Sequence, residues 1–353
     1  KAHGLDKNGH LYKVNNFEFY RYEDTIKLAD DPDYNQANFE GMLEIKGDSD
    51  HTKLIEMLDA LNDESQKIDD VLDTYFDTEN LVYWLAFQIL TGNCDTQNRN
   101  CYLYSPLNSK VWYILDWDND GMLRKLELSL TGFSDYASWE RGASNYWGNV
   151  LFNRALRSKS FRSELDRAVK DLRSYLTETR LTKMIKHYRE VTESLVFASP
   201  DIDNLPVTKD QYEQIAAAIP SEIEENYKSF RESFKKPMPF YIGVPQIDNG
   251  NLRINWDASY DFKARDIRYT VELARDYAIS DVVFKAEDVL LPEVTCDAPD
   301  AGQYFVRVRA TNSDGFTQDA FDYYVTDDGK HYGMKCFYVQ DGGKVVEDTY
   351  EEG

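Results

Sequence analysis

The chain has 353 residues, a formal net charge of −23 and 42% hydrophobic residues. This length accommodates two domains, and this hydrophobic content supports real cores, so a disordered chain is not expected. The acidic balance argues against nucleic acid or an anionic membrane surface as a partner, because both attract clustered Lys and Arg. The most apolar run, residues 81–90, is shorter than the roughly 18 residues that a membrane span needs, so no span is expected.

Residues 1 to about 236 have mixed patterns in which helices dominate. A strand followed by a loop is predicted over 11–22, and apolar residues recur at helical spacing over 52–61. Asp77 and Thr78 are N-cap candidates for a helix over 79–91 that Gly92 closes. Because this helix is apolar almost all round, we expect it to be central and buried.

Polar residues lie on both sides of a predicted hairpin. Strand patterns cover 101–104 and 111–115, and the turn between them returns the chain to where the first strand began. Asp118, after the second strand, should therefore lie close to Asp95 and Asn100, which precede the first. Two carboxylates and an amide are the groups expected in a site for Mg²⁺ and acid–base chemistry.

The same layout occurs in protein kinases, which have a helix, a catalytic loop with Asp and a later Asn, a hairpin, and a metal-binding Asp. Asp95 and Asn100 have the spacing of that Asp and Asn. In phosphoryl transfer, one carboxylate accepts or orients the proton of the attacking hydroxyl. An amide oxygen and a second carboxylate hold Mg²⁺ against the phosphates.

The motifs themselves resemble the spore coat protein H (CotH) kinase family. The stretch from Gly9 to Lys13 resembles the family's G-N-L-Y-K element, and the resemblance covers 1 to about 235. The family signature, N-x-D-x-x-x-N-x-N-x-Y and then W-D-x-D after a hairpin, is matched by Asn93, Asp95, Asn98, Asn100, Tyr102, Trp117, Asp118 and Asp120.

The resemblance implies an atypical, secreted bacterial protein kinase fold and phosphorylation of protein Ser or Thr with Mg²⁺ and ATP. It implies that Asp95 is the catalytic aspartate, that Asn100 and Asp118 bind the metal and nucleotide, and that Asp120 is an auxiliary metal-site carboxylate. The expected partners are proteins of the cell surface or spore coat, and the expected location is extracellular or at the cell surface.

The chain departs from the family pattern in two respects. Asp116 stands where the family often has Pro, which adds a carboxylate to the site. The family places its nucleotide-covering lobe and an ATP-contacting lysine upstream of the G-N-L-Y-K element. We therefore expect mostly the helical C-lobe in this chain, with the N-lobe largely missing, and we expect activity in the full-length protein rather than in this part alone.

Two other functions fit the same sequence. The residues Asp116, Asp118, Asp120 and Glu127 match the EF-hand pattern for Ca²⁺, although 111–115 reads as a strand where an EF-hand needs a helix. A degenerate kinase domain could also serve as a surface adhesion or assembly module, because the appended C-terminal domain has a fold that usually mediates recognition.

Short strand patterns beyond residue 236 predict a β-sandwich. Residues 302–315 resemble the F strand and F–G turn of a fibronectin type III domain, with Trp256 on strand B and Tyr269 on strand C. The expected fold class is α+β, with a kinase-like domain over 1–236 and an immunoglobulin-like or fibronectin type III-like sandwich over 237–327. A hairpin and acidic tail occupy 328–353.

Three further expectations concern the long helices, the cysteines and a stretch that contains serine and tyrosine. Long helices are predicted over 150–196 and over 208–234, the latter interrupted near Pro220. The four cysteines lack zinc spacing, and free thiols are favoured over a Cys296–Cys336 disulfide. A serine- and tyrosine-containing stretch resembles a kinase activation loop but is better explained as a surface loop; its residues are Ser129, Ser134, Tyr136 and Ser138.

Overall fold

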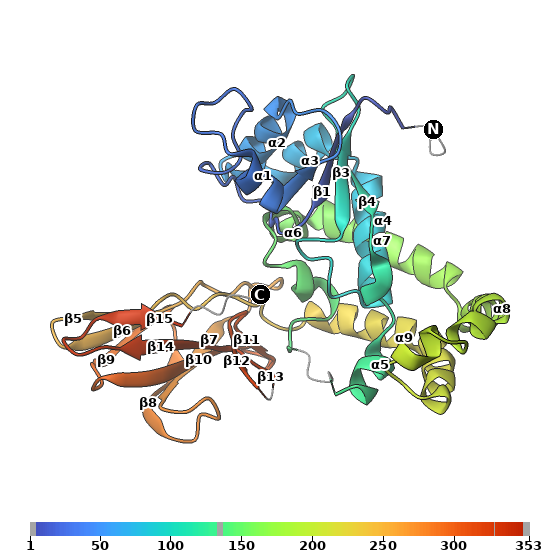
Figure 1. Ribbon diagram of the computed structural model, residues 1–353. Coiled ribbons are helices and arrows are strands. Elements are labelled where there is room, and N and C mark those ends of the chain that lie inside the picture. Colours follow the sequence, from blue (N-terminus) through green and yellow to red (C-terminus); the bar gives the residue numbers. More distant parts are fainter. Residues whose placement is uncertain (1–4, 133–136, 328, 349–353) are drawn as a thin grey trace. The chain divides into compact units, whose positions relative to one another are not determined.

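The computed structural model describes residues 5–132, 137–327 and 329–348. The helices lie mainly in the first two thirds of the chain and the larger sheets in the C-terminal part, which gives a mixed α and β architecture (Figure 1). The chain forms two compact units, Lys1–Ser134 with Asn145–Phe230, and Asp135–Ser144 with Arg231–Gly353. Among the described residues, no helix is both long and apolar enough to cross a membrane.

A four-stranded antiparallel sheet organises the first unit, with the strand order β2-β1-β3-β4. Its strands are β1 (His10–Val14), β2 (Leu43–Ile45), β3 (Cys101–Ser105) and β4 (Tyr113–Asp116). The β3–β4 hairpin pairs Cys101 with Asp116, so the chain leaves the hairpin at the level where it entered. The predicted hairpin is confirmed.

Helix α4 (Thr78–Thr91) is buried along most of its length, lies against β4 and packs on α7 (Figure 1). The side chain of Asp77 caps its start by accepting a 2.9 Å bond from the backbone N–H of Asn80. Gly92 ends it in the left-handed conformation at φ 64°, where a side chain would add strain. The other helices of eight residues or more are α2 (Thr52–Asn62), α3 (Ile68–Tyr75), α6 (Val150–Arg157), α7 (Lys159–Tyr175), α8 (Glu178–Val196) and α9 (Lys209–Ser233).

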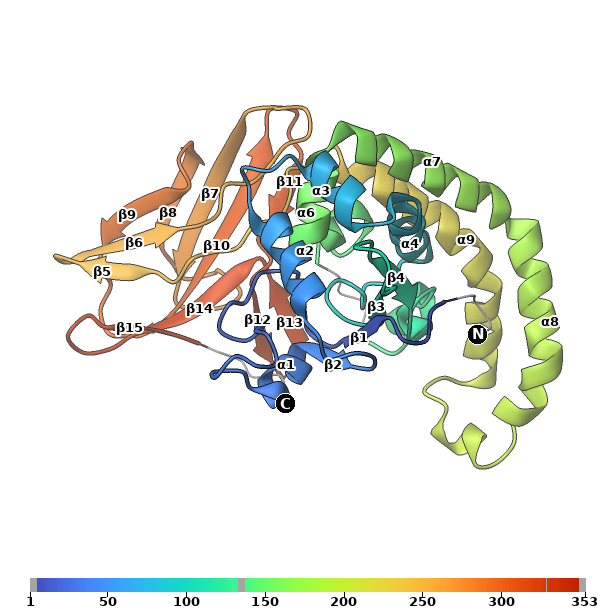
Figure 2. The ribbon, with the colours of Figure 1, turned by 90° about the horizontal axis from the view of Figure 1, so that it is seen from above.

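The predicted interruption near Pro220 is wrong, because α9 continues through it. The hydroxyl of the next residue, Ser221, donates to the carbonyl of Ala218 at 2.8 Å. A proline inside a helix costs about 3 kcal/mol. Tertiary packing offsets this cost, since Ile223 and Phe230 are buried and Asn226 donates to the carbonyl of Leu90 at 3.0 Å. Helices α8 and α9 lie side by side (Figure 2).

The second unit contains two main sheets, as the period-two patterns predicted. One has the order β15-β14-β10-β7-β8, with β11 also paired to β10, and the other has the order β5-β6-β9. A separate hairpin joins β12 and β13. The strands are β5 (Gln246–Asp248), β6 (Asn251–Asn255), β7 (Ile267–Ala274), β8 (Val282–Val289), β9 (Glu293–Asp297), β10 (Gly302–Asn312), β11 (Thr317–Asp319), β12 (Tyr323–Thr326), β13 (Gly329–Tyr332), β14 (Met334–Val339) and β15 (Val345–Glu347).

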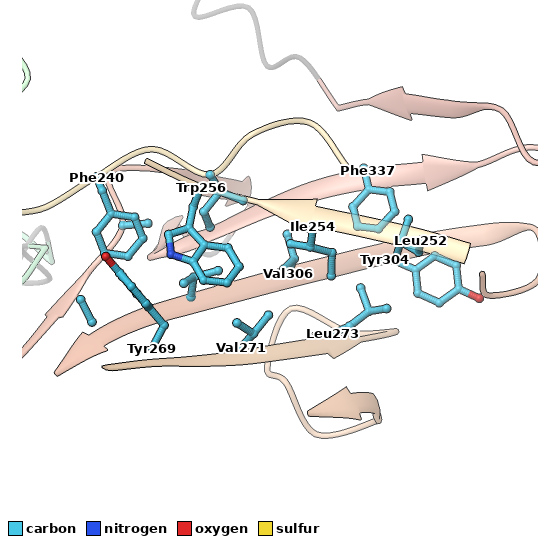
Figure 3. Close-up of a cluster of buried hydrophobic side chains, with 14 of the residues drawn as sticks. Phe240, Leu252, Ile254, Trp256, Tyr269, Val271, Leu273, Tyr304, Val306 and Phe337 are labelled. Carbon is cyan, nitrogen blue, oxygen red and sulfur yellow. The ribbon is translucent and has the colours of Figure 1, made fainter. Parts of the chain in front are cut away.

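One hydrophobic core is shared by the strands of both sheets (Figure 3). Trp256, Tyr269 and Tyr304 are all buried in it, and the rings of Trp256 and Tyr269 meet edge to face at 5.2 Å. Phe337, from β14, belongs to the same core. None of the four cysteines forms a disulfide within the described part of the chain, so they are thiols, as favoured. The hairpin predicted after residue 328 is formed by β14 and β15, and residues 349–353 of the acidic tail lie outside the described residues.

Candidate active site

The loop after α4 begins in a fixed position. Asn93 is buried, and its backbone N–H donates to the carbonyl of Gln88 at 3.0 Å. Its side-chain Nδ2 donates to Gln88 Oε1 at 3.0 Å and lies 3.3 Å from Asn119 Oδ1. Gln88 Nε2 in turn donates to Asp116 Oδ1 at 2.8 Å. This network ties the end of α4 to the end of β4, so the start of the loop and the segment 116–121 are held together.

Asp95 and Asn100 are in direct contact. Asn100 Nδ2 donates to Asp95 Oδ2 at 2.7 Å, which leaves the amide oxygen of Asn100 free of that bond. Arg99 Nε lies 3.8 Å from Asp95 Oδ1, so this arginine pairs with a carboxylate. The Asp95 side chain is 53% exposed and is therefore open to a substrate. Asn100 has φ 58°, a left-handed conformation that asparagine tolerates better than most residues.

The segment after β4 approaches the same loop. A Cβ atom on Gly121 would lie 2.7 Å from Asn93 Oδ1 and 3.3 Å from Asp95 Cβ, so this close approach requires glycine. Asp118 has φ 54°, and Asn119–Gly121 forms a 3₁₀ turn after it. Strained backbone of this kind is often found at functional sites.

The electrostatics place the acidic residues near one another. The pKa of Asp95 is raised above its ordinary value, mainly because the surrounding protein removes part of its water. Arg99 and the bond from Asn100 oppose this shift, whereas the charges of Asp120 and Asp118 add to it. Both aspartates therefore lie within electrostatic reach of Asp95.

We expect Asp120→Asn to lower the pKa of Asp95 in the metal-free protein, because it removes a like charge. Because the pKa of Asp95 is higher in the folded than in the unfolded chain, the free energy of unfolding falls as the pH rises through the folded-state pKa and Asp95 ionises. Carboxyl-carbon NMR titration measures the shift. The exposed Asp341→Asn is a control that removes the same charge elsewhere; an equal pKa drop in that variant would show a net-charge effect instead of local proximity.

Asp116 and Glu127, the other two residues of the EF-hand pattern, are hydrogen-bonded to other side chains of the protein. Asp116 accepts from Gln88, and burial raises its pKa. Glu127 lies in α5 (Lys125–Leu130) and accepts two bonds from Arg124, at 2.9 and 2.7 Å. In the described part of the chain, no three His, Cys, Asp or Glu side chains gather closely enough to hold an ion by themselves.

Sequence reasoning did not identify the residues that hydrogen-bond Gln97 and Asn98 and so hold the loop that carries Asp95. Asn98 Nδ2 donates to Asn16 Oδ1 at 2.7 Å and to Glu18 Oε1 at 2.5 Å. On another side, Asn149 Nδ2 donates to the carbonyl of Gln97 at 2.9 Å. The one available signal was Gln88, which interrupts the apolar run 81–90; the other partners come from distant parts of the chain.

Of the stretch that resembles an activation loop, Ser129 lies in α5. Ser134 and Tyr136 lie outside the described residues. The hydroxyl of Ser138 donates to Asp319 Oδ2 at 2.8 Å and accepts from Gln318 Nε2 at 2.7 Å, both in the second unit.

Comparison with known proteins identifies the first unit. The family model described as CotH kinase protein matches residues 1–230, about two thirds of the chain. The chain belongs to the CotH kinase family. Residues 1–230 therefore form a kinase-like domain, as the motifs around Asp95 and Asp118 indicated, and the site lies within the matched region.

Comparisons with curated proteins and with solved structures do not identify a further relative that supports a conclusion about this chain. No curated protein matches the chain. Among solved structures, the twitchin kinase region from C. elegans is similar at 19% identity, with 27% of this chain and 20% of that chain covered and a TM-score of 0.21. This chain thus spans about a fifth of that one, and so low a TM-score supports no conclusion about the fold.

Proposed function

We propose that the CotH kinase domain transfers the γ-phosphoryl group of ATP to a Ser or Thr hydroxyl of a protein substrate. The observation that carries the proposal is the contact between Asp95 and Asn100 at the end of a buried helix, with Asp118 and Asp120 in electrostatic reach. These residue types occur in the same order in the catalytic and metal-binding elements of protein kinases.

Asp95 would orient the attacking hydroxyl and accept its proton. Its half-exposed carboxylate gives a substrate access, and the bond from Asn100 restricts its rotation. Burial raises its pKa, which makes the ionised form a stronger base than an ordinary aspartate. Arg99, at 3.8 Å, limits that rise.

Asn100, Asp118 and Asp120 would hold Mg²⁺, a hard cation that takes oxygen ligands and keeps part of its shell as water and substrate phosphates. An amide and two carboxylates suit such a shared shell better than a cage made by the protein alone. When bound with the nucleotide, the ion would neutralise charge on the phosphates.

Calcium binding through Asp116, Asp118, Asp120 and Glu127 is less well supported. The segment that leads into these residues is the strand β4. The carboxylate of Glu127, which would be the bidentate Ca²⁺ ligand, already has both oxygens bonded to Arg124. A calcium ion at this place would have to displace that ion pair.

We further infer that the second unit is fibronectin type III-like, since the β5-β6-β9 sheet shares a core with β7 and β10 and Trp256 packs on Tyr269. Such a fold usually mediates spacing or recognition. An inactive adhesion or assembly protein is therefore the second candidate function. Either function would be exercised outside the cell, as the family resemblance implies.

The test is to supply the full-length native protein with Mg²⁺ and ATP labelled on either the γ- or the α-phosphate, together with Ser- and Thr-containing peptides. We expect γ-label on peptide hydroxyls and its loss when EDTA removes the metal. Transfer of the α-label would instead show nucleotidyl transfer. If neither label is transferred and no Mg²⁺-nucleotide binds, the adhesion or assembly function is correct.

A further inference from the structure

The strand that follows β10 in the second unit is interrupted. Arg309 of β10 faces Asp319 of β11, whereas Arg307, two residues along, faces Met334 of β14. Strands β11 and β14 therefore pair with successive parts of the same edge of β10. The residues between these two strands form the β12–β13 hairpin, in which Tyr323 pairs with Tyr332. We call residues 320–333 the inserted hairpin.

A segment from the middle of the kinase-like domain's sequence is bound at the start of the inserted hairpin. Trp139 is buried, and its Nε1 donates to the carbonyl of Ala320 at 3.1 Å. Its ring meets that of Phe321 edge to face at 4.9 Å and lies 6.2 Å from that of Tyr332. The neighbouring Ser138 bonds the residues just before the hairpin, as described above. These contacts explain why residues 137–144 group with the second unit.

Further along the chain, the same segment reaches residues that bond the loop 93–100, which carries Asp95 and which we call the catalytic loop. The Ser144 hydroxyl bonds the carbonyls of Trp139 and Arg141, at 2.9 and 3.0 Å, which folds the segment on itself. The 3₁₀ helix Gly142–Tyr146 then crosses from the second unit into the first. We call residues 137–149 the bridging segment.

The far end of the bridging segment holds the catalytic loop. Tyr146 is 1% exposed, and its hydroxyl donates to the carbonyl of Asn93 at 3.1 Å. The same hydroxyl lies 3.0 Å from Thr96 Oγ1. Both bonded residues belong to the loop that carries Asp95, and Asn149 secures Gln97 of the same loop. The bridging segment therefore contacts this loop on either side of Asp95.

We propose that the second unit positions the catalytic loop through the bridging segment, with Trp139 as the anchor and Tyr146 as the contact to the loop. The coupling passes along the covalent chain, so it does not depend on how the two units are oriented. The bonds from Tyr146 and Asn149 restrain the loop around Asp95 in addition to the network at Gln88, and a misplacement of about 1 Å can lower a rate about 100-fold. Trp139 and Tyr146 are positioning residues; neither is placed against the reacting atoms.

This proposal rests on the proposed kinase function for its kinetic part only. In the full-length protein, Trp139→Ala should make backbone amides of residues 93–98 exchange hydrogen about tenfold faster, because local opening is less costly. Phosphate transfer should show a kcat about 10- to 100-fold lower, with KM for ATP changed less than about threefold. Tyr146→Phe, which removes the hydroxyl alone, should accelerate exchange in 93–98 and leave the inserted hairpin protected.

The matched control is Trp256→Phe, which weakens the core of the second unit without touching the bridging segment. Below its melting temperature it should leave exchange in 93–98 unchanged. Trp139→Phe keeps the ring and loses the bond to Ala320; it should accelerate exchange in 93–98 to a smaller degree, and it decides the question if Trp139→Ala does not fold.

The proposal is overturned if the Trp139 variants free residues 137–141 while the loop at 93–98 keeps its protection. It is overturned equally if Trp256→Phe accelerates loop exchange as much as they do, since the effect would then be general destabilisation. A parent protein that transfers no phosphate would contradict the kinase function alone, because the exchange measurement still shows whether the second unit restrains the loop.

Discussion

Asp95→Asn is expected to abolish phosphate transfer in the full-length protein while leaving its fold and most of its nucleotide affinity intact. General-base groups contribute roughly 10²–10⁴-fold to a rate, so kcat should fall by about that factor. Asparagine keeps the shape of aspartate and can still accept the bond that Asn100 donates to Asp95. Removing a negative charge near a triphosphate should leave ground-state binding unchanged or strengthen it. Calorimetric titration with Mg²⁺-ATP and the labelled-phosphate assay measure the two quantities separately.

Glu127→Gln is the control that separates a kinase from a calcium site. Asp118 is a ligand in both proposed sites, so changing it would not distinguish them. Asp95 belongs only to the kinase site, and Glu127 belongs only to the calcium site. Because Glu127 is occupied by Arg124, we expect the change to leave phosphate transfer nearly unaltered. The reverse pattern would assign the site to calcium: Glu127→Gln would erase a Ca²⁺-dependent rise in melting temperature, and Asp95→Asn would do nothing.

Trp256→Ala should destabilise the second unit by about 3–5 kcal/mol, the usual cost of removing a large buried aromatic side chain. The side chain is 4% exposed and meets Tyr269 at 5.2 Å between ring centroids, so its removal would leave a cavity at the centre of the core. Chemical denaturation of the whole chain measures the change, with hydrogen exchange in β7 and β10 identifying the transition that belongs to this unit.

Trp256→Phe serves as the comparison for this prediction as well. Phenylalanine keeps an aromatic ring at this position and removes less volume from the core than alanine does. Its cost should therefore be clearly smaller than that of alanine. Equal denaturation midpoints for the parent and Trp256→Ala would contradict the placement of this residue in the core.

The sequence alone predicted the elements whose signals are local. The cap at Asp77, the buried helix and the left-handed Gly92 follow from residue types within one stretch of chain, and all three are present. The strands of the second unit follow from a period of two. Helix α9 shows the limit of such signals, because Pro220 predicts a break and the buried Ile223 and Phe230 on the following turns keep the helix continuous.

For the site, spacing and motif determined which residues to consider, and the hairpin return determined that Asp118 should approach Asp95. Only the tertiary structure showed that Asn100 bonds Asp95, that Gly121 lies against Asn93, and that Arg124 engages Glu127. The bonds of Tyr146 to the loop that carries Asp95, and the anchoring of Trp139 beside Ala320, also had no sequence signal. Such contacts join residues far apart in the chain, and their energy depends on packing and burial that no local pattern records.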